Sequence, residues 1–337
     1  MKKIGIVGTG SMGVAHAKAW LNTEASLVAC TAKHEDHAEQ FATQYDLKPY
    51  PDVSSMLAEI DILDICAPTH LHYDMVLKAA KAGKQIFCEK PLARTLEQGQ
   101  KMIKACQNAG VKLSVGHVVR FFPEYTRAKS LVDSGQIGQL ALINLSRETF
   151  RPKKKQSNWF IDFEKSGGVI LDLMIHDFDY AHWLAGEVES VYAKNISNAN
   201  PDAQIDHALV ILTHKNGVIS HVEGSWAYPP PMFRTSFEIS GSGGMIDHNS
   251  QASTPIDIYM HKTANGETAD IPAPTSPVEE DPWTSEIKAF YAALRQDAPL
   301  PVPAEEGLAA LQIALAAIES ARTNKAVPLK SLTELSQ

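Results

Sequence analysis

Residues 3–13 read KIGIVGTGSMG, an apolar run followed at once by a turn that contains Gly8, Gly10 and Gly13. The apolar run predicts a buried strand, and a helical pattern begins after the turn. A GxGxxG turn between a strand and a helix is typical of dinucleotide binding, because the glycines allow a tight turn, close approach of a pyrophosphate and packing of the helix on the strand. The predicted phosphate-binding residues are Gly8, Thr9, Gly10, Ser11, Met12 and Gly13.

Around this turn, short β-rich runs alternate with longer helical patterns as far as residue 118. Such alternation predicts βαβ units and a parallel sheet, and therefore a dinucleotide-binding domain over residues 1–118. The best delimited helix starts after the N-cap residue Thr95 and runs to Asn108, with Gly110 just beyond its end. The predicted strands are 3–7, 26–31, 60–66, 85–88 and 112–115.

Beyond Phe121, turns rather than regularly spaced helices interrupt the strand-like alternation. This pattern predicts a second domain over residues 119–337, built on an antiparallel sheet. Asn216 and Gly217 form the dipeptide that two-residue type I′ hairpins favour. The predicted strands are 140–150, 188–196, 207–213, 218–228 and 234–240. The predicted helices are 169–184, 283–295 and 304–323.

The composition limits the class of protein. The 337 residues suffice for two domains, and an apolar content of 44% is ordinary for a globular chain. The net charge of -8, without a long basic run, argues against nucleic-acid binding. No segment approaches the roughly 18 apolar residues that a membrane helix needs. The four cysteines form no CxxC pair, so we expect reduced thiols and a cytoplasmic protein without a membrane partner.

The end of the second predicted strand bears on the choice between NAD and NADP. Enzymes that use NAD usually place an acidic residue there to bind the ribose 2′-hydroxyl, but no carboxylate occurs here before Glu35. Thr31, Lys33 and His34 could instead donate hydrogen bonds to a 2′-phosphate. The sequence therefore favours NADP over NAD, although Lys33 and His34 could equally be solvated loop residues.

Three further motifs carry a resemblance to a known family. They read APTHLH at 67–72, CEKPLA at 88–93, and SGG at 166–168 ahead of DLMIHDFD at 172–179. In content and order they resemble the glucose-fructose oxidoreductase, inositol dehydrogenase and MocA (Gfo/Idh/MocA) family. The resemblance implies a Rossmann domain, a second α/β domain with a large, mostly antiparallel open sheet, and terminal helices that can pack back on the first domain. It also implies hydride transfer between a nicotinamide and a secondary hydroxyl or ketone of a sugar, inositol or related polyol.

Lys90 follows a predicted strand at the carboxyl edge of the sheet, where open α/β sheets bind ligands. Its ammonium group could stabilise a developing alkoxide, although local sequence alone would fit a surface lysine as well. The resemblance implies that Lys90 is catalytic, that Glu89 contacts the ribose on the nicotinamide side, and that the Lys90–Pro91 bond can be cis. The further cofactor-binding residues that it implies are Ala67, Pro68 and His72.

Asp172, His176 and Asp179 are spaced i, i+4, i+7, which predicts one polar stripe on the otherwise largely apolar helix 169–184. Such a stripe suits a helix that meets a pocket, and the alternative is an amphipathic helix with this face in solvent. An imidazole near a carboxylate suits proton transfer at neutral pH. The resemblance implies that His176 is the general base or acid and that Asp172 binds substrate and tunes His176.

Other side chains are weaker candidates for the substrate pocket. The resemblance places Arg120 where the chain enters the second domain, so that it could line the pocket. Trp159 and Tyr228 could stack on a sugar ring or simply pack in the interior. A cationic run at 153–155 would favour an anionic substrate if it faced the pocket.

Three histidines, His70, His72 and His117, invite a metal interpretation. No cysteine or carboxylate cluster has ligand spacing, and hydride transfer to nicotinamide needs no metal, so we predict none. Two alternatives to a dehydrogenase stay open. One is a family member that uses bound cofactor in a redox-assisted glycoside hydrolysis or isomerisation. The other is a non-catalytic regulator, disfavoured because Lys90, Asp172 and His176 occur together. The resemblance also implies a homo-oligomer, a dimer or tetramer.

Overall fold

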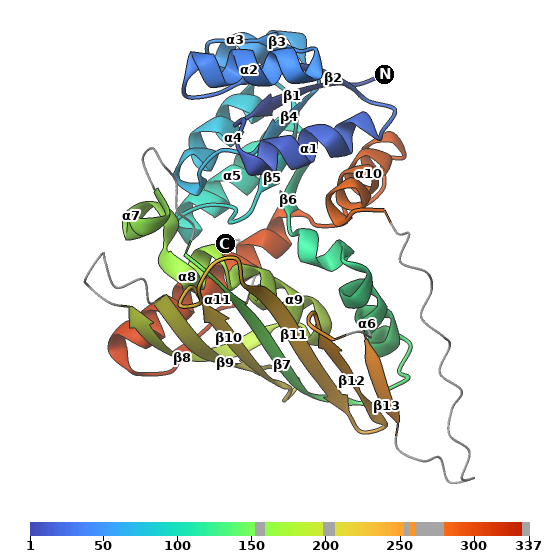
Figure 1. Cartoon of the computed structure of the whole chain (residues 1–337), viewed down its shortest axis with the longest axis vertical. Helices are drawn as coiled ribbons and strands as arrows, with labels where there is room; N and C mark the ends of the chain where they lie inside the picture. The colour runs from blue at the N-terminus through green and yellow to red at the C-terminus, as the bar shows by residue number, and fades with distance from the viewer. Residues whose placement is uncertain (152–158, 198–205, 253–255, 261–279, 332–337) are drawn as a thin grey trace. The chain divides into compact units, whose positions relative to one another are not determined.

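The computed structural model describes residues 1–151, 159–197, 206–252, 256–260 and 280–331 (Figure 1). The chain forms two compact units. The first comprises Met1–Phe121 and Glu280–Leu311, and the second comprises Phe122–Glu279 and Gln312–Gln337. No helix in the described part of the chain is long and apolar enough to cross a membrane.

The first unit contains a parallel sheet of six strands in the order β3-β2-β1-β4-β5-β6, which confirms the predicted fold class. The strand order reverses between β1 and β4, and open α/β sheets bind ligands at such a reversal. The short strand β3 was not predicted. The strands are β1 Lys3–Val7, β2 Ser26–Thr31, β3 Lys48–Pro49, β4 Ile62–Ile65, β5 Gln85–Glu89 and β6 Leu113–Gly116.

The helices of this unit follow the expected start and stop signals. In α5 the Thr95 hydroxyl accepts a hydrogen bond from Gln98 N at 3.2 Å, and Gly110 ends the helix with φ +66°. The core includes residues from near the end of the chain, because Phe290 and Tyr291 of α10 pack with Trp20 of α1. The helices are α1 Ser11–Leu21, α2 Glu35–Tyr45, α3 Val53–Met56, α4 His72–Lys81, α5 Leu96–Ala109, α10 Pro282–Arg295 and the first part of α11 Ala304–Thr323.

The second unit contains a mostly antiparallel sheet of eight strands in the order β13-β12-β11-β7-β10-β9-β8-β14, in which β7 and β10 pair in parallel. Strands β12, β13 and β14 were not predicted. The strands are β7 Leu140–Thr149, β8 Val188–Ser197, β9 Asp206–His214, β10 Ile219–Ser225, β11 Phe233–Gly241, β12 Gly244–Asn249, β13 Asp257–Met260 and β14 Val327–Pro328.

The hairpin between β9 and β10 corrects the predicted turn type. A type I′ turn needs positive φ at both Asn216 and Gly217, but only Gly217 has it, at +87°. Gly217 N donates to His214 O at 2.9 Å and His214 N donates to Val218 O at 2.9 Å. The loop is therefore a three-residue turn with the left-handed glycine in its last position, so Asn216 keeps an ordinary backbone conformation.

The single helix predicted over 169–184 is also wrong, because it is broken into α8, Gly168–Asp172, and α9, Ile175–Ala185. Met174 at the break is fully buried and lies over Gly224 of β10, where a Cβ would come within 2.1 Å of Met174 Cγ. The sequence pattern missed the break because nearly all residues on both sides of it are buried. The remaining helices are α6 Pro123–Asp133 and α7 Phe163–Ser166.

Candidate active site

The glycine turn after β1 brings four elements into backbone contact. Gly8 has φ +96°, donates its N–H to Thr31 O at 2.9 Å, and has room for no side chain, because a Cβ would lie 2.5 Å from Cys66 O. A Cβ on Gly13 would lie 2.0 Å from Gly8 O. Glycine at these two positions is therefore required by the packing of β1, β2, β4 and α1.

Gly10 is different, because no neighbour in the described part of the chain requires glycine there. Its backbone angles, φ -78° and ψ -165°, suit any residue, and a Cβ there would meet no atom within 4 Å. It directly precedes α1, whose first N–H groups receive no side-chain cap. An open backbone at a helix N-terminus suits an anionic ligand such as a pyrophosphate, so this turn fits the predicted dinucleotide.

The residues after β2 remain compatible with the predicted binding of the adenosine ribose. Thr31 is buried, and its carbonyl oxygen accepts the hydrogen bond from Gly8 N. Lys33 and His34 are exposed, and His34 precedes the first turn of α2, in which Glu35 and Asp36 lie. The two candidate cations are thus available to a ligand, with two carboxylates close by in sequence.

His72, for which we expected a place beside the cofactor, is fully buried. Its Nδ1 lies 2.9 Å from Pro91 O and its Nε2 lies 2.8 Å from Ala67 O. The ring therefore joins the loop after β4 to the loop after β5. These contacts hold together the two loops that carry Ala67, Pro68 and Lys90.

Glu89 and Lys90 lie at the end of β5. Glu89 is buried, and its Oε2 accepts a hydrogen bond from the backbone N–H of Lys90 at 3.0 Å. Lys90 is half-buried, and the Lys90–Pro91 bond is cis. The carboxylate thus holds the start of the loop from which the Lys90 side chain projects.

Behind Glu89 lies a buried polar cluster that the sequence interpretation missed. His16 of α1 is 3.0 Å from both carboxylate oxygens of Asp64 through Nδ1, and 3.1 Å from Glu89 Oε1 through Nε2. Trp20 Nε1 donates to Asp64 Oδ2 at 2.6 Å. A signal was available, because Asp64 interrupts an otherwise apolar buried strand, and a buried carboxylate needs partners.

This cluster has the residue types of a metal site but the spacing of a hydrogen-bonded one. Cys66 Sγ is 3.2 Å from His16 Nδ1, which is itself 3.0 Å from Asp64 Oδ1. Nitrogen, oxygen and sulfur ligands of a tetrahedral zinc ion would stand about 3.3 to 3.7 Å apart, given bond lengths of about 2.0 to 2.3 Å. Burial also raises the pKa of the Cys66 thiol, which keeps it protonated. The donors and acceptors here satisfy one another.

In the second unit, the Ser-Gly-Gly motif sets the start of α8. Gly167 and Gly168 have φ +78° and +68°, and Asp206 Oδ2 of β9 accepts a hydrogen bond from Val169 N at 3.0 Å. Asp172 is the last residue of α8 and is buried, whereas His176 lies in the first turn of α9 and is half-buried. The two side chains therefore project from different helices, which corrects the predicted single stripe.

A buried ion pair anchors the helix that carries His176. Arg147 of β7 donates from Nε and a terminal nitrogen to the two oxygens of Asp177, at 2.8 and 2.9 Å. Both side chains are buried, and this bidentate contact ties the first turn of α9 to the middle of the sheet. Asp177 is the sequence neighbour of His176, so the pair restricts where the histidine can lie.

The three weaker pocket candidates have protein partners. Arg120 is buried and donates to Glu306 at 3.0 Å within the first unit. Trp159 stacks on Phe160 with ring centroids 4.1 Å apart. The Tyr228 hydroxyl donates to Glu148 Oε1 at 3.0 Å. These contacts restrict all three side chains, and the lysines at 153–155 lie outside the described residues.

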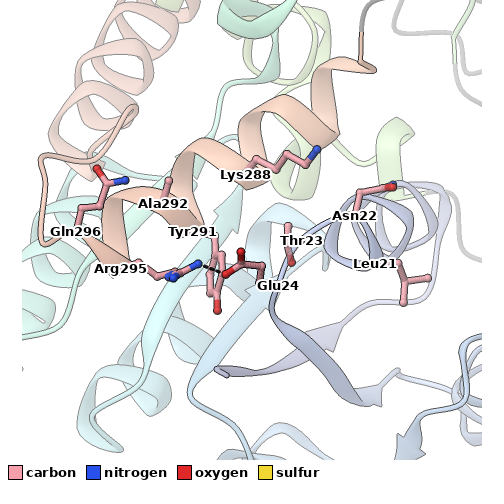
Figure 2. A pocket seen from close by; sticks show the side chains of 9 residues that line it. All are labelled: Leu21, Asn22, Thr23, Glu24, Lys288, Tyr291, Ala292, Arg295 and Gln296. Atoms are coloured by element: carbon pink, nitrogen blue, oxygen red, sulfur yellow. Dashed lines mark hydrogen bonds and ion pairs between the residues drawn. The ribbon is translucent and has the colours of Figure 1, made fainter.

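A surface hollow of about 710 Å³ lies in the first unit, between the end of α1 and α10 (Figure 2). Arg295 forms an ion pair with Glu24 across it, and Lys288 is paired with Glu280. The hollow is lined by Leu21 and Asn22 at the C-terminal end of α1, whereas the glycine turn precedes the N-terminal end. It is therefore separate from the dinucleotide-binding edge, and its cations are neutralised.

Comparisons with known proteins identify the family. A model described as "Oxidoreductase family, NAD-binding Rossmann fold" matches residues 2–117, and one described as "GFO/IDH/MocA C-terminal domain" matches residues 125–247. Inositol 2-dehydrogenase of Rhizobium meliloti is 31% identical, over 97% of this chain and 99% of its own length. The chain belongs to the Gfo/Idh/MocA family. The resemblance read from the sequence motifs is thereby confirmed.

Two other relatives of this Gfo/Idh/MocA chain extend the comparison. Myo-inositol 2-dehydrogenase of Thermotoga maritima is 27% identical, over 98% of this chain and 99% of its own. The crystal structure of the WlbA dehydrogenase from Bordetella pertussis, a complex with NADH and UDP-GlcNAcA, has a TM-score of 0.83, 25% identity and coverage of 98% and 99%. The chain is accordingly an NAD(P)-dependent oxidoreductase that acts on CH–OH groups, as predicted.

Gly10→Ala separates cofactor binding from folding. We expect the variant to melt within about 2 °C of wild type, because the added methyl group meets no protein atom and the backbone angles suit alanine. Its affinity for the dinucleotide should fall about tenfold or more, because the methyl group occupies the space through which the pyrophosphate approaches the backbone. Thermal denaturation and titration of the intrinsic fluorescence with the dinucleotide measure the two effects.

Gly13→Ala is the contrasting variant, since its Cβ would collide with Gly8 O. It should lower the melting temperature by several degrees. Unchanged dinucleotide affinity in Gly10→Ala would contradict the placement of the pyrophosphate at this turn.

Proposed function

We propose that this Gfo/Idh/MocA oxidoreductase transfers hydride between its nicotinamide cofactor and a secondary hydroxyl or ketone of a cyclitol or pyranose sugar. The observation that carries the proposal is the position of Lys90, directly after β5 at the carboxyl edge of the parallel sheet, with its backbone N–H bound by the buried Glu89. The names of two relatives, both inositol dehydrogenases, support the substrate class.

The chemistry assigns one role to each of three side chains. In the oxidative direction, His176 accepts the proton of the substrate hydroxyl, and the Lys90 ammonium group stabilises the negative charge that develops on its oxygen. Asp172 binds a substrate hydroxyl and favours the protonated form of His176. When bound, the nicotinamide supplies the hydride acceptor. Glu89 orients the ribose on the nicotinamide side, while Ala67 and Pro68 contact the cofactor from the neighbouring strand end.

Lys90→Ala and His176→Ala should each lower kcat for oxidation of the polyol substrate about 100-fold or more, since each removes a group that acts on the reacting oxygen. Initial rates over a panel of inositols and pyranoses measure this. Lys101→Ala is the matched control, because Lys101 is exposed and pairs with Glu97 on its own helix. Near-wild-type rates in both active-site variants would refute the assignment. Substrate conversion without net change in cofactor absorbance would instead favour the redox-assisted hydrolysis or isomerisation.

The proposal includes a preference for NADP over NAD. Its support is the absence of a carboxylate at the end of β2 and the exposure of Lys33 and His34 in the loop that follows. We expect kcat/KM to be higher with NADP. Lys33→Ala should reduce it about tenfold with NADP, and little with NAD, because only the 2′-phosphate uses the added cation. Equal losses with the two cofactors would contradict this role for Lys33.

The oligomeric state is a further part of the proposal. Six exposed apolar side chains lie on one face of the second sheet, because they stand on paired or alternate positions of β7, β10, β9 and β8. The six residues are Leu142, Tyr192, Ile196, Leu209, Ile211 and Ile219. Contiguous exposed apolar surface of this kind favours association, so we propose that this face joins subunits of a homo-oligomer.

Ile211→Asp should therefore dissociate the oligomer, because it places a charge in the centre of this apolar face. Sedimentation velocity measures the change in molecular mass. Leu21→Asp is the control, since Leu21 is an exposed apolar residue of the first unit and does not belong to this sheet. A wild-type monomer at micromolar concentration would contradict the proposed interface.

We also propose a cytoplasmic location. All four cysteines are free, and Cys30, Cys88 and Cys106 are buried. Free buried thiols suit a reducing compartment.

A further inference from the structure

The buried cluster behind Glu89 has no role in the chemistry described so far. We propose that His16 is a positioning residue, which holds Glu89 as a carboxylate and through it fixes the backbone from which Lys90 projects. The inference rests on the proposed function, since it assumes that Glu89 and Lys90 serve the reaction.

The geometry suits a doubly protonated ring. Nδ1 of His16 faces both oxygens of Asp64 at 3.0 Å, and Nε2 faces Glu89 Oε1 at 3.1 Å. A neutral imidazole has one N–H and could donate to one carboxylate only, so its other nitrogen would meet an oxygen lone pair. The imidazolium satisfies both contacts at once.

The charges support the same protonation state. His16 and Asp64 are fully buried, and Glu89 is 6% exposed. Burial by itself would lower the pKa of His16, but the Asp64 carboxylate beside it raises that pKa well above the usual value. Burial would likewise raise the pKa of Glu89, yet the hydrogen bond from His16 keeps it lowered. One buried cation thus balances two carboxylates that would otherwise be costly to keep ionised.

Several other groups surround His16, Asp64 and Glu89. Trp20 donates to Asp64 from α1, Cys66 contacts His16 and Asp64 from the end of β4, and the Phe87 ring packs edge-on against His16. Around Glu89 lie His72, whose pKa burial lowers, Cys88, whose thiol pKa burial raises, and Lys90. The side chain of His16 donates to Glu89, and its hydrogen bond lowers the pKa of Glu89 more than the charge of Lys90 does.

The hydrogen bonds of Glu89 therefore link α1 to the backbone of Lys90. Glu89 accepts from His16 through Oε1 and from the Lys90 N–H through Oε2. Without the imidazolium, the buried Glu89 would face Asp64 with no cation between them, and its pKa would rise. Glu89 would then be ionised only at high pH. Any step that needs its carboxylate would fail as the pH falls, whereas in the wild type it stays ionised across the neutral range.

The test compares pH profiles. His16→Gln keeps a polar side chain of similar length but removes the cation. We expect kcat/KM for the dinucleotide to fall about tenfold or more further in this variant than in the wild type between pH 9 and pH 6, because protonation of Glu89 then adds to the protonation of the general base His176 that both proteins share. Trp20→Phe is the matched control, because it removes a hydrogen bond to Asp64 and leaves the contact with Glu89.

A double variant shows which carboxylate causes the additional loss of kcat/KM at low pH, the acid limb of the His16→Gln profile. In His16→Gln with Asp64→Asn, Glu89 is the only carboxylic acid left in the cluster, and its burial still raises its pKa, so the limb should persist. If it vanishes, the limb belonged to Asp64 and the inference is overturned. Parallel profiles for His16→Gln and wild type, or the same limb in Trp20→Phe, would overturn it too.

Two measurements keep this inference separate from the proposed function. Nitrogen-15 NMR of the wild-type imidazole should show both His16 nitrogens protonated up to pH 8, with no need for turnover or for a variant that folds. A neutral tautomer at that pH would overturn the inference. Full activity in Glu89→Gln would instead refute the proposed role of Glu89, whatever the NMR result for His16.

Discussion

The first unit depends on one close approach of backbone to backbone, at the turn after β1. Gly8 lies against the carbonyl group of Cys66, and Gly13 lies against the carbonyl of Gly8, at distances that no Cβ could tolerate. This contact fixes where α1 begins relative to β1 and β4. The second turn of α1 then brings His16 to Asp64 and Glu89. The place of the phosphates and the charge state of the cluster behind Glu89 thus have a common origin in a turn that admits only glycine.

Both units place a buried ion pair next to a proposed catalytic residue. Glu89 precedes Lys90 and is held by His16, and Asp177 follows His176 and is held by Arg147. Breaking such a buried pair by removing one partner typically costs about 3 to 5 kcal/mol. In both units the residue next to the proposed catalytic side chain is therefore held in place by a buried ion pair. The net charge of -8 does not predict these ion pairs, because they depend on which charged residues are neighbours in the fold.

The parts of the fold that the sequence predicted are those with local signals. Strands β1 and β2 matched their predicted bounds, because a run of apolar residues ended at a glycine or a polar loop. Where a helix is buried on all sides, its apolar and polar residues do not alternate with the helical period. The sequence pattern therefore did not predict the break at Met174. The turn at Gly217 differed because Asn216 and Gly217 suit two turn types.

The site divides in the same way. The glycine turn and Lys90 could be located from motifs, because their chemistry depends on residues adjacent in sequence. His16, Asp64 and Glu89 lie up to 73 residues apart and meet only through the order of strands β1, β4 and β5, so no local pattern predicted their contact. The one sequence feature that indicated the cluster was a polar residue, Asp64, inside an apolar strand.

The discontinuity of the first unit affects how the chain reaches its native state. Its core joins Trp20 and Phe87 to Ile287, Phe290 and Tyr291, which are synthesised some 200 residues later than Phe87. A ribosome therefore releases most of the chain before the nucleotide-binding half can complete its interior. Until α10 emerges, the side of Trp20 that packs against Phe290 and Tyr291 has no partner from α10. The N-terminal dinucleotide-binding motif therefore belongs to a core whose last members are among the last third of the chain to be synthesised.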